Sequence, residues 1–248
     1  MTTRREFIKN AALASAGLAF GGISTRANAA SYSRIVGANK KVNLAHIGIG
    51  NRGLENINSF EKTGLANVVA LCDVDMGAEH TRKAMDMYPN AKRFKDFREM
   101  FDKMGKEVEA VVISTPDFAH YPATLMAMAE GKHVYVEKPL TRTFHESELL
   151  LKATAKYPNV VTQMGNQGHS EANYFQFKAW KEAGIIKDVT AVTAHMNNPR
   201  RWHGWDPSII KFPAAEPIPA TLDWDIWLMS QRYHDYNKDF HYGQWRCW

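Results

Sequence analysis

The chain has 248 residues, of which 45% are hydrophobic, 23% charged and 11% aromatic, which is typical of a globular protein and excludes a disordered, collagen-like or disulfide-stapled one. Its formal net charge is +5, but four basic side chains and one acidic one place +3 in the first 29 residues, so the other 219 carry only +2. A nucleic-acid partner requires clustered lysines and arginines, and we therefore expect none.

Three further features exclude classes of partner or site. The longest apolar run, Ala11–Ile23, is shorter than the roughly 18 residues that a membrane-spanning helix needs, so no stable membrane insertion is expected. The two cysteines, Cys72 and Cys247, form neither a disulfide framework nor a Cys-x-x-Cys motif. No metal site is expected, because the later histidines lack the spacing of metal ligands. These histidines are His169, His195, His203, His234 and His241.

The N-terminus resembles a bacterial twin-arginine export signal. Residues 3–9 read Thr-Arg-Arg-Glu-Phe-Ile-Lys, an apolar stretch follows over Ala11–Gly22, and Ala27–Ala29 has the small-x-small pattern of a cleavage site. Residues 1–29 are therefore expected to be a signal peptide, and the mature protein is expected in the periplasm. The alternative interpretation is a buried amphipathic N-terminal helix. Because the twin-arginine route carries folded proteins, it suits a protein that loads a nucleotide cofactor before export.

From Val42 onwards, short apolar runs rich in β-branched residues alternate with segments of helical length. The predicted strands are Val42–Ile47, Asn67–Cys72, Ala110–Ile113, His133–Val136 and Val160–Met164. The predicted helices are Leu54–Lys62, Gly77–Met87, Asp96–Met104, Pro122–Ala129 and Phe144–Lys156. This alternation predicts the α/β class, with a doubly wound parallel sheet of the Rossmann type over residues 40–164.

A second region is expected over residues 165–248, as the incomplete start of a mixed α/β domain. It opens with a predicted helix over Glu171–Ala183 and a predicted strand over Val189–Met196. Six of the seven tryptophans fall in the last 47 residues, which suggests a surface that packs against a partner. The alternative is a proline-rich loop that packs its own aromatic side chains on the sheet domain. The six tryptophans are Trp202, Trp205, Trp224, Trp227, Trp245 and Trp248.

The first predicted strand runs directly into a Gly-x-Gly-x-x-Gly motif. In this motif Gly48 makes the tight turn, Gly50 lets the backbone approach a pyrophosphate, and Gly53 lets the following helix pack against the strand. The phosphates are expected at the helix N-terminus. Asp73 ends the second strand 20 residues after Gly53, where it would bind the adenosine ribose. A carboxylate there repels a 2′-phosphate and favours NAD, although Arg52 leaves NADP open.

Two further strand ends supply candidate residues at the same edge of the sheet. Ser114, Thr115 and Pro116 follow one strand and suit contact with the nicotinamide ribose. His120, at the entry of the next helix, has either a role in the site or a structural role.

Glu137, Lys138 and Pro139 follow the next strand and make the strongest candidate for chemistry. A lysine is usually a solvated surface charge. At a strand end that faces the nicotinamide, however, the ammonium of Lys138 can hold a substrate oxygen and stabilise its alkoxide character as hydride leaves. We therefore expect Lys138 to be catalytic.

These motifs resemble those of the glucose-fructose oxidoreductase / inositol dehydrogenase / MocA family, above all in the segment Gly131–Leu140. The resemblance covers about residues 42–248 and implies an NAD(P)-dependent oxidoreductase with an N-terminal Rossmann domain and a C-terminal mixed α/β domain. It also implies contacts with the cofactor at a set of strand-end residues. This set comprises Asn51, Arg52, Asp73, His120, Glu137, Lys138 and Asn166, and we add the three motif glycines, Ser114, Thr115, Pro116 and Pro139.

The sequence departs from the family in its length. Family members are usually longer, and their second catalytic element, an Asp and a His on one helix, would follow Trp248. We therefore expect a fragment that lacks its general base and forms a homo-oligomer only with a complete C-terminal domain.

The expected activity is hydride transfer to or from a sugar, a cyclitol or a related polyol. One alternative is an NAD-dependent glycosidase that oxidises its substrate transiently, a group of relatives that tends to replace the lysine of the Glu-Lys-Pro motif. The other alternative is a nucleotide-binding remnant without activity.

Overall fold

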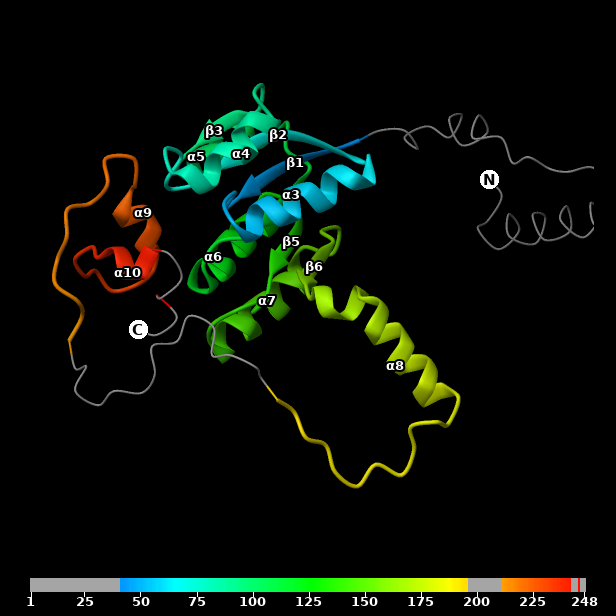
Figure 1. Cartoon of the computed structure of the whole chain (residues 1–248). Helices are drawn as coiled ribbons and strands as arrows, with labels where there is room; N and C mark the ends of the chain where they lie inside the picture. Colours follow the sequence, from blue (N-terminus) through cyan, green and yellow to red (C-terminus); the bar gives the residue numbers. More distant parts are fainter. Residues whose placement is uncertain (1–40, 196–210, 242–244, 246–248) are drawn as a thin grey trace, which may run out of the picture. The chain divides into compact units, whose positions relative to one another are not determined.

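Six parallel strands form the centre of the structure, a computed structural model that describes residues 41–195, 211–241 and 245 (Figure 1). The strands are β1 Val42–Ile47, β2 Ala66–Cys72, β3 Lys92–Phe94, β4 Ala110–Ile113, β5 His133–Glu137 and β6 Thr162–Gly165. Their order across the sheet is β3-β2-β1-β4-β5-β6. This is the strand order of a Rossmann fold, so the predicted α/β class with a doubly wound parallel sheet is confirmed. The predicted leader lies outside the described residues.

The register of the three central strands brings their carboxyl ends to one edge of the sheet. Ile47, the last residue of β1, pairs with Cys72 of β2 and with Ile113 of β4. The glycine-rich turn after β1, Asp73 after β2 and Ser114 after β4 therefore begin at the same level. In an open parallel sheet this edge, where the strand order reverses, is the place where ligands bind.

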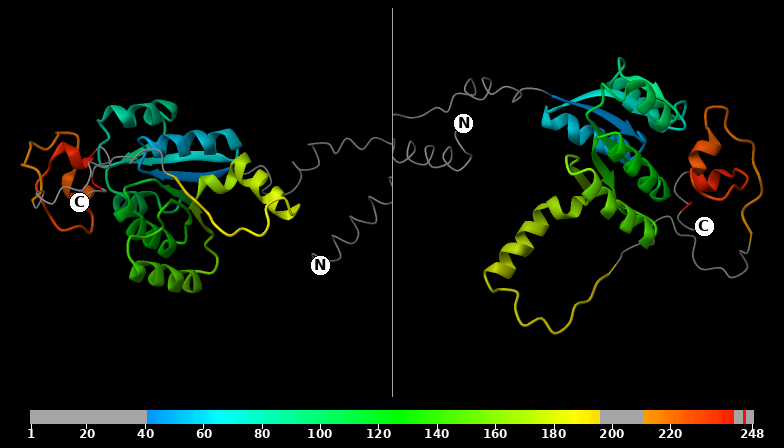
Figure 2. Two further views of the ribbon diagram at one scale, coloured as in Figure 1. Left: turned by 60° about the horizontal axis from the view of Figure 1, so that its bottom comes forward. Right: turned by 180° about the vertical axis from the view of Figure 1, so that it is seen from behind.

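Helices cover both faces of the sheet (Figure 2). The helices are α3 Arg52–Thr63, α4 Glu79–Met87, α5 Phe97–Met104, α6 Asp117–Ala129 and α7 Phe144–Lys156. On one face, Ile57 of α3 and Ala84 of α4 pack with Leu71 of β2. On the other face, Met100 of α5 and Ala123 of α6 belong to a second apolar core. None of the helices in the described residues is both long and apolar enough to cross a membrane.

Helix α6 starts earlier than the sequence predicts. The predicted start was Pro122, because proline is favoured in the first turn of a helix. In the structure the helix already begins at Asp117, and Pro122 lies inside it. Pro122 lacks an N–H and therefore costs the helix one hydrogen bond, which α6 tolerates because buried residues such as Phe118 and Ala119 pack its first turn.

Two strand predictions need correction. The strand β3 was missed because it has only three residues, and two of them, Lys92 and Arg93, are exposed and charged. The predicted strand Val189–Met196 is wrong, because residues 189–195 have no regular structure; Met196 lies outside the described residues. Residues 189–195 are all exposed, and no described strand pairs with them. An apolar run without a neighbouring strand has no partners for its backbone hydrogen bonds.

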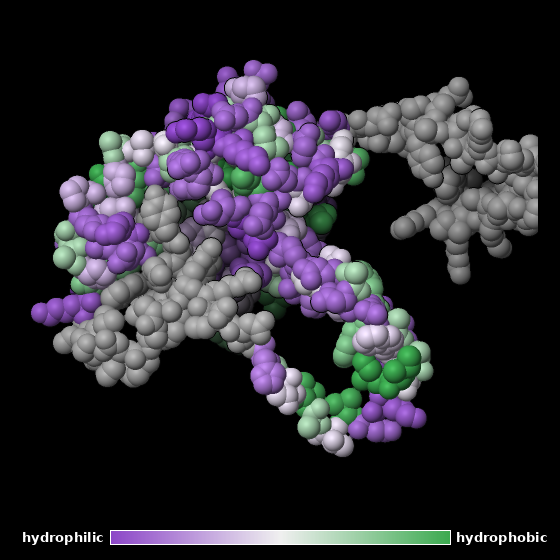
Figure 3. All heavy atoms as spheres, viewed as in Figure 1, coloured by the Kyte–Doolittle hydropathy of each residue, from purple (hydrophilic) through white to green (hydrophobic). Residues whose placement is uncertain are grey.

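The predicted helix over Glu171–Ala183 is present as α8, Ala172–Glu182, after the short 3-10 helix η1, Gln167–Ser170. Every residue of α8 is exposed, including Phe175, Phe177 and Trp180. Figure 3 shows apolar residues gathered near the end of α8 and in the segment after it. Helix α8 therefore presents apolar surface and adds nothing to the core of the sheet.

The aromatic C-terminal region packs on its own chain where the structure describes it. Trp224 and Trp227 belong to the short helix α9, Trp224–Leu228. Both are buried in a cluster with Phe118 of α6 and with Phe240 of the short helix α10, Lys238–His241. For these side chains the structure confirms the alternative of a loop that packs its own aromatics, and not the partner surface. Trp202, Trp205 and Trp248 lie outside the described residues.

His46 is a polar side chain buried in the centre of the sheet. It lies in β1, is fully buried, and its ring meets that of Phe60 edge-on at a centroid distance of 6.1 Å. Neither ring nitrogen has a hydrogen-bond partner in the described residues. Burial lowers the pKa of His46 from 6.5 to about 3, so the ring is neutral in the folded protein at neutral pH.

This burial predicts a loss of stability in mild acid. Below pH 6.5 the unfolded chain takes up a proton at His46, and the folded chain does so only near pH 3. Between pH 8 and pH 5 the free energy of unfolding should therefore fall by about 2 kcal/mol more in the native sequence than in His46→Leu, measured by urea unfolding. The exposed His145 provides the control, since His145→Leu should keep the native pH dependence. Equal pH dependence of the native protein and His46→Leu would contradict the account.

Candidate functional site

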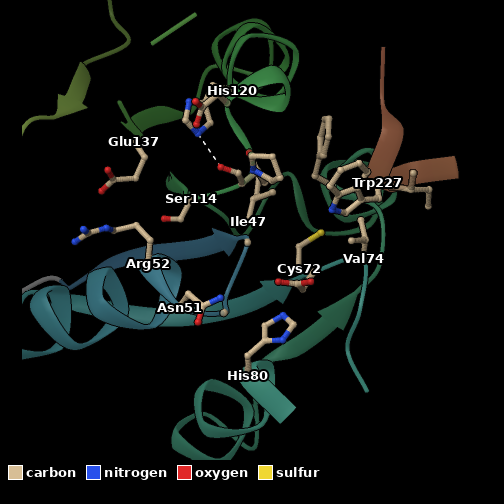
Figure 4. A pocket seen from close by; sticks show the side chains of 18 of the residues that line it. Ile47, Asn51, Arg52, Cys72, Val74, His80, Ser114, His120, Glu137 and Trp227 are labelled. Atoms are coloured by element: carbon tan, nitrogen blue, oxygen red, sulfur yellow. Dashed lines mark hydrogen bonds between the residues drawn. The ribbon is translucent and has the colours of Figure 1, made fainter. Parts of the chain in front are cut away.

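A cavity of about 530 Å³ lies at the carboxyl edge of the sheet (Figure 4). Eleven of the fourteen predicted site residues line it, and Gly53, Pro139 and Asn166 do not. The eleven are Gly48, Gly50, Asn51, Arg52, Asp73, Ser114, Thr115, Pro116, His120, Glu137 and Lys138. The topology thus brings residues from four strand ends together around one space.

The turn after β1 has the geometry of a phosphate-binding loop. Gly48 has a φ of +80°, and a Cβ there would lie 2.8 Å from the backbone of Ser114. A Cβ at Gly53 would lie 2.0 Å from the carbonyl oxygen of Gly48, so helix α3 can start this close to β1 only with glycine. Within the described residues no side chain caps the N-terminus of α3, where Asn51 is the N-cap. The first N–H groups of α3 therefore suit an anion, and this part of the site fits a pyrophosphate.

Asp73 joins the ends of β1 and β2. One carboxylate oxygen accepts a hydrogen bond from the N–H of Ile49 at 2.9 Å, and the other accepts one from the N–H of Asp75 at 3.0 Å. The first of these bonds fixes the glycine-rich turn to the end of β2. Asp73 is half-buried and lines the cavity, so its oxygens also face the place where an adenosine ribose would lie.

The basic side chains that line the cavity lie at different positions around it. Arg52 forms an ion pair with Glu55, one turn along α3. Figure 4 shows Arg52 on the side of Glu137, whereas His80 lies near Cys72, the residue before Asp73. The NADP alternative that Arg52 left open stays a prediction.

Two cavity residues near Asp73 were not identified from the sequence. His80, in the first turn of α4, lies against Gly50, where a Cβ would approach its ring to 2.0 Å. Lys95 follows β3 and lines the same cavity. No motif marks either residue, and only the position after a strand end of the sheet could have suggested Lys95. Cys72 also lines the cavity, but burial raises the pKa of its thiol well above the usual value, so it is a neutral packing residue.

His120 links the ends of β4 and β5. It is 1% exposed, its Nε2 lies 2.9 Å from the carbonyl oxygen of Thr115, and its Nδ1 lies 2.6 Å from that of Pro139. A carbonyl oxygen only accepts, so a neutral ring donates to one of these oxygens and an imidazolium to both. These contacts join two strand ends and thus indicate a structural role for His120, one of the two roles that the sequence left open. His120 also lines the cavity.

A buried network of polar side chains holds Glu137. Glu137 is 4% exposed, and its carboxylate accepts hydrogen bonds from the side-chain amides of Asn56, at 3.0 Å, and Gln167. The amide of Asn56 also donates to the hydroxyl of Ser114 at 2.9 Å. Asn56 was not predicted, because it lies within α3 and belongs to no motif. Gln167 stands in the segment Gly165-Asn166-Gln167 of the family resemblance, but only Asn166 was predicted there as a contact. The network fixes the strand end that carries Lys138.

Lys138 is exposed and lines the cavity directly after this network. Asn166 follows β6 and is exposed, and it does not line the cavity. Its neighbour Gln167 donates a hydrogen bond to Glu137. Within the described residues no group of three or more His, Cys, Asp or Glu side chains could hold a metal ion. Two lysines of the described part of the chain line the cavity, Lys95 after β3 and Lys138 after β5, and Lys138 is the one that follows the Glu137 network.

Comparison with known proteins identifies the class of this site. The model of the GFO_IDH_MocA oxidoreductase family, NAD-binding Rossmann fold, matches residues 42–165, which is half of the chain. The chain belongs to this family. NAD as the predicted cofactor is confirmed. Most of the residues that line the cavity lie within the matched range.

The relatives have two kinds of activity. An inositol 2-dehydrogenase of Salmonella typhimurium is 26% identical over 193 residues, covering 75% of this chain and 54% of that protein. An alpha-N-acetylgalactosaminidase of Shewanella oneidensis is 31% identical over 161 residues, covering 58% of this chain and 35% of that protein. The chain thus spans about half or less of the length of these curated relatives.

The solved structures show the same fold. Scyllo-inositol dehydrogenase from Lactobacillus casei, with bound NAD(H) and scyllo-inositol, superposes with a TM-score of 0.52 at 23% identity. The match covers 61% of this chain and 44% of that structure.

The position of Asp73 makes a prediction about the cofactor. Asp73→Ala removes the acceptor for the ribose and the tie to Ile49, so NAD binding should weaken by about 1–3 kcal/mol, and the preference for NAD over NADP should narrow. Calorimetric titration with both cofactors measures the two effects. Asp102→Ala, an exposed change on α5, should leave both affinities unchanged. If Asp73→Ala binds NAD as the native protein does, the assignment of the ribose site fails.

Proposed function

We propose that the protein is an NAD-dependent oxidoreductase that transfers a hydride between the cofactor and a CH–OH group of a sugar, a cyclitol or a related polyol. The observation that carries this proposal is the place of Lys138, which shares one cavity with the glycine-rich turn and Asp73. The family match and the inositol dehydrogenases among the relatives support it.

The roles of the residues follow from their positions. When bound, NAD supplies the acceptor for the hydride. The turn at Gly48 and the N-terminus of α3 hold its pyrophosphate, and Asp73 holds its ribose. Lys138 donates a hydrogen bond to the substrate oxygen and stabilises its negative charge, which an alkoxide carries before the hydride leaves and a carbonyl oxygen gains as the hydride arrives. In the direction of oxidation the hydroxyl proton of the substrate leaves to water. Lys138 is the one residue to which we assign a catalytic role.

Glu137 and His120 act on Lys138 through the backbone. Glu137 is fixed by Asn56 and Gln167, and His120 lies against the carbonyl oxygen of Pro139. Lys138 is thus held between two residues whose own positions are set by buried contacts. Such support limits the movement of a catalytic group, which must be placed to within a fraction of an ångström.

A glycosidase that uses NAD without net redox is the second candidate. The observation in its favour is the similarity to the Shewanella alpha-N-acetylgalactosaminidase and to a glycosyl hydrolase family 109 protein, which is 30% identical over 217 residues. The lysine at position 138 favours the dehydrogenase. A panel of free polyols and chromogenic glycosides separates the two, because a dehydrogenase accumulates NADH from polyols and a glycosidase releases the aglycone without net NADH.

We propose a periplasmic location for the mature protein, on the basis of the twin-arginine pattern in residues 3–9. Changing Arg4 and Arg5 together to lysine should leave the precursor in the cytoplasm, as judged by cell fractionation. Normal export of this variant would point to another route.

Lys138 provides the test of the chemistry. Lys138→Ala should lower kcat about 10²- to 10³-fold with NAD affinity preserved, because the ammonium acts on charge that develops in the transition state. Lys152→Ala, an exposed change on α7, should leave kcat unchanged. The measurements are the initial rate of NADH formation and the NAD dissociation constant. A Lys138→Ala variant that keeps its turnover, or that loses NAD binding along with it, would contradict the catalytic role.

A further inference from the structure

The segment Thr221–Trp227 lies against the loop that follows β2, although about 150 residues separate them in the sequence. Leu222 forms an antiparallel bridge with Asp75. The N–H of Asp223 donates to the carbonyl oxygen of Val74 at 3.0 Å. Backbone contacts therefore hold the segment against the residues that directly follow Asp73, after the end of β2, at the entrance to the proposed cofactor site.

Two side-chain features fit the segment to this place. The ammonium of Lys95 donates to the carbonyl oxygen of Thr221 at 2.9 Å. Gly77 lies under Thr221, and a Cβ at position 77 would lie 2.1 Å from the Cγ2 atom of Thr221. The segment can thus take this position only because residue 77 has no side chain.

The segment presents Ile226 and Trp227 to the cavity. The carboxylate of Asp223 caps α9 by accepting a hydrogen bond from the N–H of Ile226 at 2.9 Å. The indole of Trp227 stacks on Trp224 at a centroid distance of 4.5 Å and meets Phe118 edge-on at 5.2 Å. Both cavity residues are therefore fixed before any ligand binds, and they give the cavity an apolar wall.

This wall lies at one end of the cavity. Figure 4 shows Trp227 beside Val74, with Glu137 at the opposite end. The ribose position is set by Asp73, and the pyrophosphate lies towards the glycine-rich turn. The base on that ribose must extend away from the phosphates, which leads it towards Val74, Ile226 and Trp227.

We propose that the segment Thr221–Trp227 is part of the NAD site and covers the adenine of the cofactor with Ile226 and Trp227. The proposal rests on the NAD binding that the proposed function requires. Adenine is flat, and its faces are largely apolar, so a rigid wall of an indole and a branched aliphatic side chain removes them from water. NAD binding and the docking of this segment then stabilise one another.

Gly77→Ala tests the proposal without changing a residue of the cavity. The added methyl group should displace Thr221, and with it the segment, which exposes the amides of residues 221–229 to faster hydrogen exchange. The dissociation constants of NAD and of AMP should then rise about tenfold, the expected size for the loss of one apolar face of a base. The dissociation constant of nicotinamide mononucleotide, which has no adenine, should stay as in the native protein.

Two further variants make the result specific. Thr221→Gly in the Gly77→Ala background removes the clashing atoms and should restore NAD affinity. Gly168→Ala is the matched control, because a Cβ there meets nothing within 4 Å. Unchanged NAD affinity in Gly77→Ala with the segment displaced would overturn the proposal, and so would an equal loss for nicotinamide mononucleotide. Absence of NAD binding in the native protein would instead overturn the proposed function as well, so the two failures are distinguishable.

Discussion

The hydrogen bond from the N–H of Ile49 to the carboxylate of Asp73 joins the two strand ends on which the cofactor site depends. The parallel register of β1 and β2 places both residues at one level, and the bond then fixes the glycine-rich turn against the end of β2. The same carboxylate is positioned for the ribose. One side chain thus links the two elements at which we propose that the pyrophosphate and the ribose bind.

Much of the fold and part of the site could be predicted from the sequence. The apolar runs gave five of the six strands, and the motif glycines and Asp73 were placed correctly at the edge of the sheet, because these signals are local. The contact of Asp73 with a ribose stays a prediction. Asn56 and Trp227 could not be found in this way, since they reach the cavity from a helix and from a distant segment. The strand β3 is too short and too charged to show a pattern, and the apolar run at residues 189–195 has no described neighbour to pair with.

This chain spans about half or less of the length of its curated relatives, and relatives with two kinds of activity match it. A protein named as an alpha-N-acetylgalactosaminidase and one named as an inositol 2-dehydrogenase both match this chain, over 58% and 75% of its length. The difference between them must therefore come from groups that touch the substrate. Within the described residues Lys138 is the group to which we assign that task, and the buried Glu137 network fixes the strand end before it.

The central claim is that one edge of the sheet binds NAD from the glycine-rich turn to the aromatic segment. A crystal structure of the protein with NADH tests it most directly. The account predicts the pyrophosphate at the N-terminus of α3, the adenosine ribose on Asp73, the adenine against Ile226 and Trp227, and the nicotinamide beside Lys138. A cofactor bound elsewhere, or one whose adenine lies in solvent away from Trp227, would contradict it.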